Sequence, residues 1–338
     1  MTNRFTAVWA DNFAQEIAAV DRFLTHFPIV SFDTEFPGFL RNTPRSASDA
    51  LRYQDLRFNV DSLKLIQLGI TLFDDLGNIG GTWEFNFRGF DEETDPHVAD
   101  SIALLKANGL DLEKSGKFGI DPEVFEEGFS EVLRMHRGRL LWVSFHGLYD
   151  SAYVMKLMTR KAMPSSPTEF AAMAGNLFER VCDLKFMAKF YQGLLGGEIG
   201  LERMAKILRV QRYGDAHQAG SDSLLTADAF VKMRAQFGLK PGMYEGFLYG
   251  LSPNICASSV HRVRAPPGQV ILVPVVPTRP VILARRSSSS RDQSFQSHHQ
   301  ASPMLYPYPS PAPMFMHRPM CIPFHALPQA PPHYQIHM

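Results

Sequence analysis

The stretch that decides the fold is residues 28–38, with the sequence PIVSFDTEFPG. Its first half is apolar enough to anchor a buried strand, and Phe36-Pro37-Gly38 ends that strand abruptly. Asp33 and Glu35 lie two residues apart, so the alternating pleat of a strand places both side chains on one face. We therefore expect a strand over residues 28–35 that carries two carboxylates at a rigid end, where they can share a cation.

Two further strands follow at short intervals. Residues 64–73 and 82–87 both have strand character, and Asp75-Leu76-Gly77-Asn78 supplies turn chemistry between them. The predicted result is three consecutive antiparallel strands.

Helical patterns flank these strands on both sides. Asp11 or Asn12 is in position to cap the first helix, and Gly109 stops the second. The predicted helices are residues 13–24, 96–108, 121–136 and a segment that begins near Tyr149.

The second half of the chain alternates between strands and helices. An apolar run at residues 140–145 suits a buried strand, and residues 167–237 have the pattern of several helices around a short strand at residues 181–184. Three antiparallel strands followed by this alternation predict an α/β fold with a mixed central sheet and helices packed on it. The ribonuclease H-like arrangement matches this order best, although the order by itself does not give the function.

The composition divides the chain into two unlike parts. The 338 residues include 34 Lys plus Arg and 34 Asp plus Glu, so net charge does not indicate a nucleic-acid or membrane-surface protein. Residues 252–338 hold 16 of the 24 prolines, seven Arg, no Lys and one acid, for a net charge of +6, which leaves residues 1–251 at −6. We expect one folded domain over residues 1–251 and a Pro/Ser/His-rich, basic, disordered tail over residues 252–338. The tail is either a solvated extension or a docking segment for a partner groove or RNA.

Cysteine content and hydropathy indicate the compartment. Three cysteines in a chain of this length are too few and too scattered for a disulfide framework or a Cys-type zinc site. No basic start followed by an apolar run opens the chain, and no segment approaches the roughly 18 apolar residues that span a bilayer. We therefore expect a soluble protein in a reducing compartment.

Two more acids follow the first pair. Asp150 comes just after the predicted strand at residues 140–145, and Asp222 follows His217 by five residues at the start of a late helix. Taken singly, each acid is more readily explained as a helix N-cap. Taken together with Asp33 and Glu35, they form one ordered set, which resembles the DEDD exonucleases in their histidine variant.

Within that superfamily, the flanking residues resemble the Caf/Pop-type deadenylases, the nucleases of the Ccr-Not complex that shorten messenger-RNA tails. The resemblance extends from about Arg4 to Leu251, and the chain departs from it in two places. The pair Gly147-Leu148 replaces the usual Ser-Gly, and residues 39–50 look divergent. The motifs that carry the resemblance are residues 32–38 (FDTEFPG), Asn59-Val60-Asp61 with residues 65–69 (LIQLG), Phe85-Asn86-Phe87, and residues 217–226 (HQAGSDSLLT).

The resemblance implies a metal-dependent 3′ to 5′ exoribonuclease that shortens poly(A) tails and releases 5′-AMP. Carboxylate ligands favour Mg²⁺ or Mn²⁺, and neighbouring carboxylates repel strongly without such ions. Two divalent cations are therefore expected. By resemblance, Asp33, Glu35 and Asp222 hold one ion, and Asp33 with Asp150 holds the other.

The remaining expectations concern the base, the substrate contacts and the partners. His217 is the candidate general base, since an imidazole titrates near neutral pH. Phe36 and His146 are the candidate substrate contacts, with a core phenylalanine as the alternative for Phe36. The resemblance further implies a single-stranded poly(A) 3′ end as substrate and a Ccr-Not scaffold and companion nuclease subunits as partners. It implies a location in cytoplasm and nucleus. It implies neither association with a membrane nor a dinucleotide ligand.

Two other functions stay open from the sequence. The first is a non-catalytic scaffold subunit of the same type of complex, although the intact acids count against it. The second is an exonuclease that trims DNA or small RNA, because no base-reading set of residues is visible.

Overall fold

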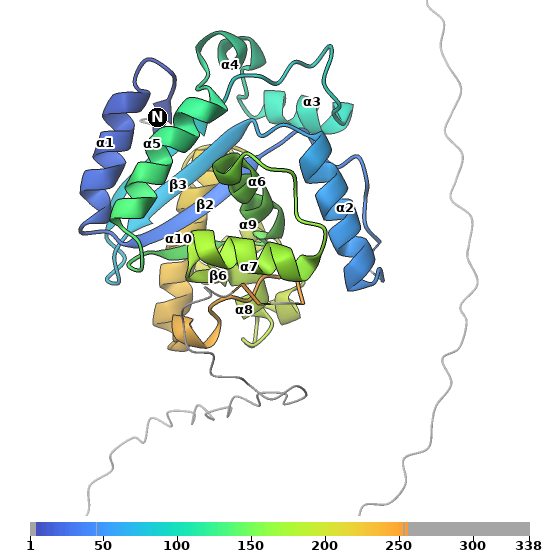
Figure 1. The fold of residues 1–338 in the computed structure, drawn as a ribbon. Coiled ribbons are helices and arrows are strands. Elements are labelled where there is room, and N and C mark those ends of the chain that lie inside the picture. Colours follow the sequence, from blue (N-terminus) through green and yellow to red (C-terminus); the bar gives the residue numbers. More distant parts are fainter. Residues whose placement is uncertain (1–4, 45, 253, 256–338) are drawn as a thin grey trace, which may run out of the picture. The chain divides into compact units, whose positions relative to one another are not determined.

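The computed structural model describes residues 5–44, 46–252 and 254–255, all of which belong to one compact unit. Its centre is a six-stranded sheet (Figure 1). The strands are β1 (Thr6–Val8), β2 (Ile29–Glu35), β3 (Gln67–Phe73), β4 (Ile79–Asn86), β5 (Leu141–Ser144) and β6 (Val181–Asp183).

The sheet is mixed, and its strand order is β1-β4-β3-β2-β5-β6. Strands β2, β3 and β4 are antiparallel neighbours, whereas β5 runs parallel to β2 and β6 runs parallel to β5. The predicted ribonuclease H-like arrangement of three antiparallel strands followed by parallel ones is confirmed. Strand β1 was not predicted; it pairs in parallel with β4 and is only three residues long.

The helices agree with the predicted ones to within a few residues, but α2 and α4 were not predicted. The apolar pattern of α2 is interrupted because Asp55 and Asn59 are buried along with its apolar side chains. The helices are α1 (Phe13–Leu24), α2 (Asp49–Ser62), α3 (Ala99–Ala107), α4 (Leu112–Phe118), α5 (Pro122–Met135), α6 (Leu148–Thr159), α7 (Pro167–Phe178), α8 (Leu184–Ala188), α9 (Leu201–Leu208) and α10 (Ala219–Phe237), with short 3-10 turns at Leu195–Gly197 and Pro241–Met243.

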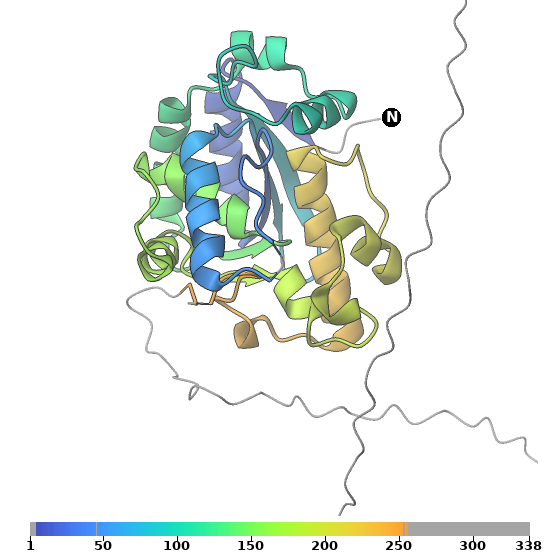
Figure 2. The ribbon, with the colours of Figure 1, turned by 90° about the vertical axis from the view of Figure 1, so that its right-hand side faces the viewer.

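The sheet separates two apolar cores. One core lies between the sheet and α1, α2, α5, α6 and α7, and the other lies between the sheet and α8, α9 and α10. Figure 2 views the sheet close to edge-on, with α2 on one side and α10 on the other. Because successive side chains of a strand point to opposite faces, β2 contributes Val30 and Phe32 to the first core and Ile29 to the second.

Strand β4 begins three residues earlier than predicted. Its first residues include Gly80 and Gly81, a pair that disfavours a strand in the sequence. Both glycines are required by packing, since a Cβ at Gly80 would lie 2.5 Å from the ring of Phe27 and one at Gly81 would lie 2.5 Å from the ring of Trp83. The sequence alone did not reveal these close contacts.

Two local expectations need correction. Asn12 occupies the N-cap position of α1, but its Oδ1 accepts a hydrogen bond from the N–H of Trp9 (2.7 Å) and caps no helical N–H. The turn between β3 and β4 is organised one residue earlier than predicted, because Asp74 Oδ1 accepts the N–H groups of Leu76 and Asn78.

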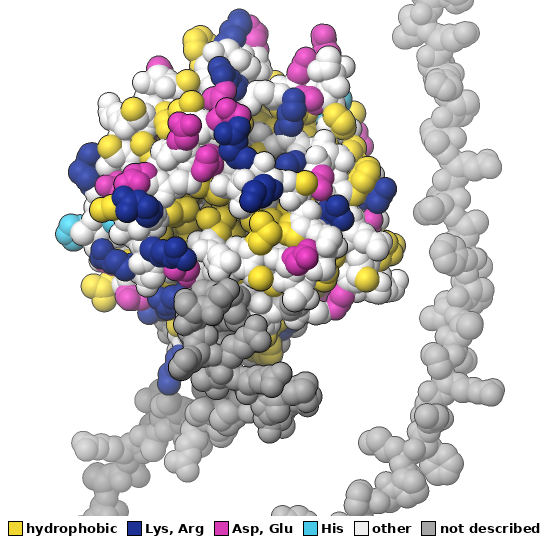
Figure 3. Space-filling view, in the orientation of Figure 1, with side chains coloured by type: hydrophobic (Ala, Val, Ile, Leu, Met, Phe, Trp, Pro, Cys, Tyr) yellow, Lys and Arg dark blue, Asp and Glu magenta, His cyan; other side chains and the backbone are white. Residues whose placement is uncertain are grey.

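The predicted tail lies outside the described residues, apart from Ser252 and residues 254–255. Ile255 is buried against the first core, and its N–H donates to the carbonyl of Gly246 (2.7 Å). Among the described helices, none combines the length and apolar character that a membrane crossing needs. On the face shown in Figure 3, basic and acidic side chains are interspersed around an apolar area.

Candidate active site

The first two acids project from the end of β2 toward α10. Asp33 lies opposite Gly69 of β3, and Glu35 lies opposite Gln67. Ser31 lies on the same face, and its hydroxyl donates to the carbonyl of Ser223 in α10 (2.8 Å). The predicted placement of both acids on one face is therefore confirmed by the register.

Helix α10 brings the third acid to this face because its first turn packs directly on β3. A Cβ at Gly69 would lie 1.9 Å from the carbonyl oxygen of Ala219, so a side chain larger than hydrogen does not fit there. The buried Glu84 of β4 accepts the N–H of Gly220 (3.0 Å) and holds the same turn. Asp222, one turn further along α10, thereby comes to lie beside Asp33.

The fourth acid comes from the opposite side of the sheet. Asp150 lies in the first turn of α6, and its Oδ1 accepts both the N–H (2.9 Å) and the hydroxyl (2.5 Å) of Thr34. Thr34 stands between Asp33 and Glu35, so one residue of β2 fastens the start of α6 beside the first two acids. The structure thus brings the four predicted acids together from β2, α6 and α10.

Burial and crowding make this cluster costly when every acid is ionised. Burial first, and then the charges of Asp150, Asp222 and Glu35, raise the pKa of Asp33 well above its usual range. The pKa of Glu35 is raised well above its usual range by burial and by the charges of Asp222, Asp150 and Glu84. Burial is also the main cause that raises the pKa of Asp150 to about 7. At neutral pH the cluster therefore favours the uptake of protons or cations.

The donor set fits divalent cations. Ligand atoms of Glu35, His217 and Asp222 all lie within 4.8 Å of one another. Asp33 adds a further carboxylate beside them, and its charge interacts with those of Glu35 and Asp222. A site rich in carboxylate oxygen suits hard ions such as Mg²⁺ and Mn²⁺.

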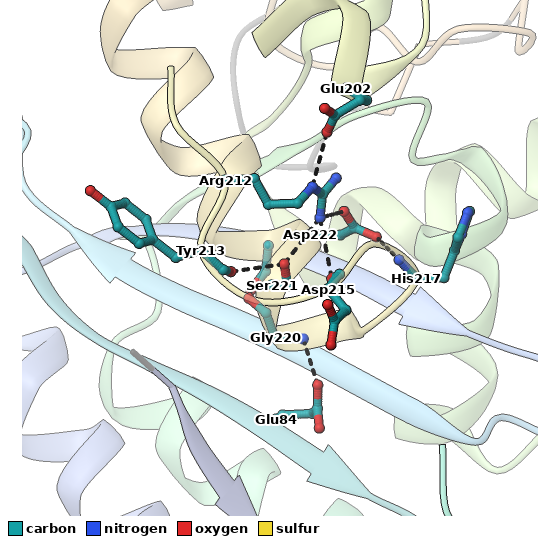
Figure 4. A network of polar contacts seen from close by, with 10 residues as sticks. Glu84, Glu202, Arg212, Tyr213, Asp215, His217, Gly220, Ser221 and Asp222 are labelled. Carbon is teal, nitrogen blue, oxygen red and sulfur yellow. Dashed lines mark hydrogen bonds and ion pairs between the residues drawn. The ribbon is translucent and has the colours of Figure 1, made fainter. Parts of the chain in front are cut away.

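His217 approaches the cluster from an exposed loop. Its backbone is left-handed (φ 59°), which is uncommon outside glycine, and its N–H donates to Asp222 Oδ2 (3.0 Å). Figure 4 shows His217 and Asp222 side by side at the start of α10. The hydrogen bond fixes the position of the histidine relative to the acid.

Arg212 is a further member of the site, which was not predicted from the sequence. Its local sequence does not distinguish it from the other arginines of the domain. Its Nη1 lies 2.6 Å from Asp222 Oδ1, its Nε lies 3.0 Å from Glu202, and it also donates to the hydroxyl of Ser221 (Figure 4). Arg212 therefore positions Asp222 within the site.

The two candidate substrate contacts lie in different surroundings. Phe36 is half-buried, and its ring stacks on Tyr153 (4.5 Å between centroids) and Tyr149 (5.8 Å). His146 is exposed, has a left-handed backbone (φ 61°), and meets the ring of Tyr249 edge to face at 5.0 Å. The aromatic packing thus makes Phe36 partly a core residue, whereas His146 is an exposed residue whose ring packs on Tyr249.

A fifth acid, Asp183, was also missed. It is fully buried at the end of β6, and its two oxygens accept backbone N–H groups from three separate segments. These donors are His146 (2.9 Å), Gly147 (3.2 Å), Lys185 (2.8 Å), Phe186 (3.3 Å) and Tyr249 (2.9 Å). Asp183 therefore fixes the loop that leads into α6 and Asp150.

The departure at Gly147-Leu148 has a structural explanation. A Cβ at Gly147 would lie 2.1 Å from the hydroxyl of Ser144, so this position accepts only glycine with the present backbone. Leu148 is buried in the first core and lies beside Gly250. Gly147 and Leu148 therefore serve packing in the loop before Asp150.

Comparison with known proteins identifies relatives along most of the chain. The model of the CAF1 family ribonuclease matches residues 8–121. The "Probable CCR4-associated factor 1 homolog 5" of Arabidopsis thaliana is 45% identical over 227 residues, which are 67% of this chain and 81% of the relative. The "Poly(A) ribonuclease pop2" of Schizosaccharomyces pombe is 37% identical over 235 residues, 68% of this chain and 69% of the relative.

Solved structures have the same fold. The Mg²⁺- and Mn²⁺-bound form of S. pombe Pop2p has a TM-score of 0.68 at 36% identity, with 73% of this chain and all of that chain covered. The yeast CAF1 structure obtained with the NOT1 MIF4G domain has a TM-score of 0.62 at 26% identity, with 72% of this chain and 96% of that chain covered.

Proposed function

This chain belongs to the CAF1 family of ribonucleases, and on that premise we propose that it is a metal-dependent 3′ to 5′ exoribonuclease that shortens poly(A) tails and releases 5′-AMP. The observation that carries the proposal is the convergence of Asp33, Glu35, Asp150 and Asp222 from β2, α6 and α10. The relative named poly(A) ribonuclease supports the choice of substrate.

The four acids have the role of holding two divalent cations, Mg²⁺ or Mn²⁺. Asp33, Glu35 and Asp222 would hold one cation, and Asp33 with Asp150 would hold the other. When bound, such a pair of cations neutralises charge on the attacking and leaving oxygens of a phosphodiester. The metal-bound form of S. pombe Pop2p supports this assignment.

Three further residues position the acids and move the proton. The ring of His217 lies within reach of Glu35 and Asp222, so it is placed to accept a proton from the attacking water. Thr34 holds Asp150, and Arg212 holds Asp222. Because Asp150 and Asp222 are each fixed by a contact from another element, this part of the site is organised before substrate arrives.

The test is a time course on 5′-labelled RNA that ends in a run of adenosines. We expect a ladder that shortens from the 3′ end with Mg²⁺, stops near the first nucleotide that is not adenosine, and vanishes with EDTA or with Asp33→Ala. Competition with poly(U) and single-stranded DNA at matched salt measures the base preference. Equal low activity of the wild type and Asp33→Ala would instead support a scaffold subunit, and loss of adenosine preference would support general trimming.

We also propose that the folded residues bind a NOT1-type MIF4G domain and a companion nuclease subunit, in cytoplasm and nucleus. The yeast CAF1 that was co-crystallised with a NOT1 MIF4G domain supports the first partner. Size-exclusion chromatography of the purified chain mixed with such a domain tests it, and two separate peaks would contradict it. Fluorescence imaging of the tagged chain tests the location.

A further inference from the structure

Four side chains form an aromatic and basic surface beside the loop that leads into Asp150; we refer to them as the 146/249 cluster. They are His146, Lys185, Lys189 and Tyr249, all at least partly exposed. Lys185 Nζ lies 4.8 Å and Lys189 Nζ 4.4 Å from the centre of the Tyr249 ring, and the His146 ring meets the same tyrosine at 5.0 Å. The tyrosine thus holds two ammonium groups and an imidazole in one place.

The cluster is fastened to the active site by one buried acid. Asp183 accepts the backbone N–H groups of His146, Lys185 and Tyr249, so it ties together the three segments that supply the cluster. It also accepts the N–H of Gly147, at the start of α6. The charge of Asp183 is among the causes that raise the pKa of Asp150. Asp183 therefore lies close to the carboxylate cluster.

The backbone of His146 adds a second indication of function. Its left-handed conformation (φ 61°) costs energy for a residue other than glycine, and such strain persists only where the surroundings enforce it. Here the enforcing contact is the hydrogen bond from the His146 N–H to Asp183 (2.9 Å). The result is a His146 whose ring is held against Tyr249 beside the site.

The charge distribution shows why this surface matters for RNA. Residues 1–251 carry a net charge of −6, and four acids crowd the reaction centre, so phosphates upstream of the cleaved bond need cations from elsewhere. Arg212 is held between Asp222 and Glu202, whereas the 146/249 cluster brings two lysines together beside Glu198, which accepts the hydroxyl of Tyr249. Single-stranded RNA is generally bound by cations combined with exposed aromatic rings, the combination that this cluster presents.

We propose that the 146/249 cluster is the subsite that binds the nucleotides immediately upstream of the cleaved bond. Lys185 and Lys189 contact phosphates, and His146 provides a ring on which a base stacks. Tyr249 holds the lysines in place, and Asp183 positions the whole cluster. The assignment rests on the proposed exoribonuclease function, and it names single-stranded RNA longer than a dinucleotide as the ligand.

The test compares two double variants of equal charge. Lys185→Ala/Lys189→Ala removes the cluster's cations, and Lys161→Ala/Lys232→Ala removes two exposed lysines outside the cluster. Both are made in the full chain that also carries Asp33→Ala, and fluorescently labelled A10 RNA is titrated in Mg²⁺ at several salt concentrations, with anisotropy as the readout. The same pairs in the otherwise wild-type chain give KM and kcat on A10 and on the dinucleotide ApA.

We expect the cluster variant to weaken A10 binding about tenfold relative to the control pair. The slope of log K against log salt should fall by about 1.4, since each lost phosphate contact on a single strand contributes about 0.7. KM on A10 should rise with little change in kcat, and cleavage of ApA should be unaffected. Tyr249→Phe should bind as the parent chain does, and Tyr249→Ala should lose part of the affinity.

Two results overturn the subsite. The first is A10 binding equal to that of the control pair, and the second is an equal loss on A10 and ApA, which indicates general damage to the site. Failure of the proposed function gives a different result, because the wild-type chain would then leave every RNA uncut whatever its lysines.

Discussion

Asp33 and Asp183 lie near the ends of two strands of one sheet, but their surroundings are opposite. Asp183 accepts five backbone N–H groups from three segments, so its negative charge is compensated by the protein itself. Asp33 instead faces Asp150, Asp222 and Glu35, with Arg212 as a partial counter-charge, and its pKa is raised by burial and by these neighbours. An acid surrounded by donors stabilises the fold, whereas an acid surrounded by acids requires a bound cation.

The sharpest way to test this difference is Asp33→Asn. Removing a carboxylate from a set that acts as a unit should lower exonuclease activity about 10³-fold or more. Because the repulsion is also relieved, the melting temperature in EDTA should rise, and the stabilisation by Mg²⁺ should shrink. A variant that melts lower than the wild type in EDTA would contradict the view that the cluster is strained without cations.

Asp183→Asn should have the opposite effect on stability. The amide cannot replace a carboxylate that accepts five N–H groups, so we expect a loss of about 2 to 5 kcal/mol in the free energy of unfolding. Stabilisation by Mg²⁺ should persist, since the four site acids are intact. Urea titrations with and without Mg²⁺ measure both quantities, and an unchanged midpoint would remove Asp183 from its structural role.

Gly69→Ala tests how the acid of α10 reaches the cluster. The new Cβ would collide with the carbonyl of Ala219, so α10 must move. We expect the free energy of unfolding to fall by about 1 to 3 kcal/mol and the exonuclease activity to be reduced. Gly116→Ala in the exposed helix α4 is the matched control, because nothing lies within 4 Å of its Cβ. The control should gain about 0.5 to 1 kcal/mol in the free energy of unfolding and keep full activity. Equal behaviour of the two variants would refute the packing argument.

The pH dependence of stability in EDTA tests the same cluster without any change of its residues. Burial raises the pKa of Asp150 to about 7 in the folded chain, while an unfolded aspartate titrates near 3.9. Between these values the folded state holds a proton that the unfolded state has released, so Asp150 makes the stability fall as the pH rises from about 4 to about 7. The raised pKa values of Asp33 and Glu35 act in the same direction. Asp150→Asn, which keeps an acceptor for Thr34, should flatten this fall in melting scans. An unchanged pH profile would show that the carboxyl of Asp150 does not cause the fall.

The elements that could be read from the sequence are those with a local periodicity. The apolar residues of β2 and the alternation of Asp33 and Glu35 predict the strand and the shared face without any knowledge of partners. Helix α5 was equally readable, because its apolar stripe faces a single core. Strand β1 and helix α2 were missed, the first because it is three residues long and the second because polar side chains are buried within it.

The main residues of the site could be named from the sequence, but their arrangement in space could not be predicted from it. All four acids and His217 were named in advance from their order along the chain, and the structure brings them together. Arg212, Thr34 and Asp183 were not assigned roles, because nothing in their local sequence distinguishes them from other arginines, threonines and capping acids. Gly69 offered a usable signal, since a glycine inside a strand often marks the close approach of another backbone.

By itself, the sequence determined which chemical groups are present and which of them share a face of a strand, because side-chain alternation is a property of neighbouring residues. Only the tertiary structure decided which acids meet one another and which are compensated by N–H donors. Those contacts join residues far apart in the chain. Thr34 and Asp150 are 116 positions apart, and the backbone of Ala219 at the start of α10 packs directly against Gly69. Their physical basis is the packing of two helices onto opposite faces of one sheet, which local periodicity does not specify.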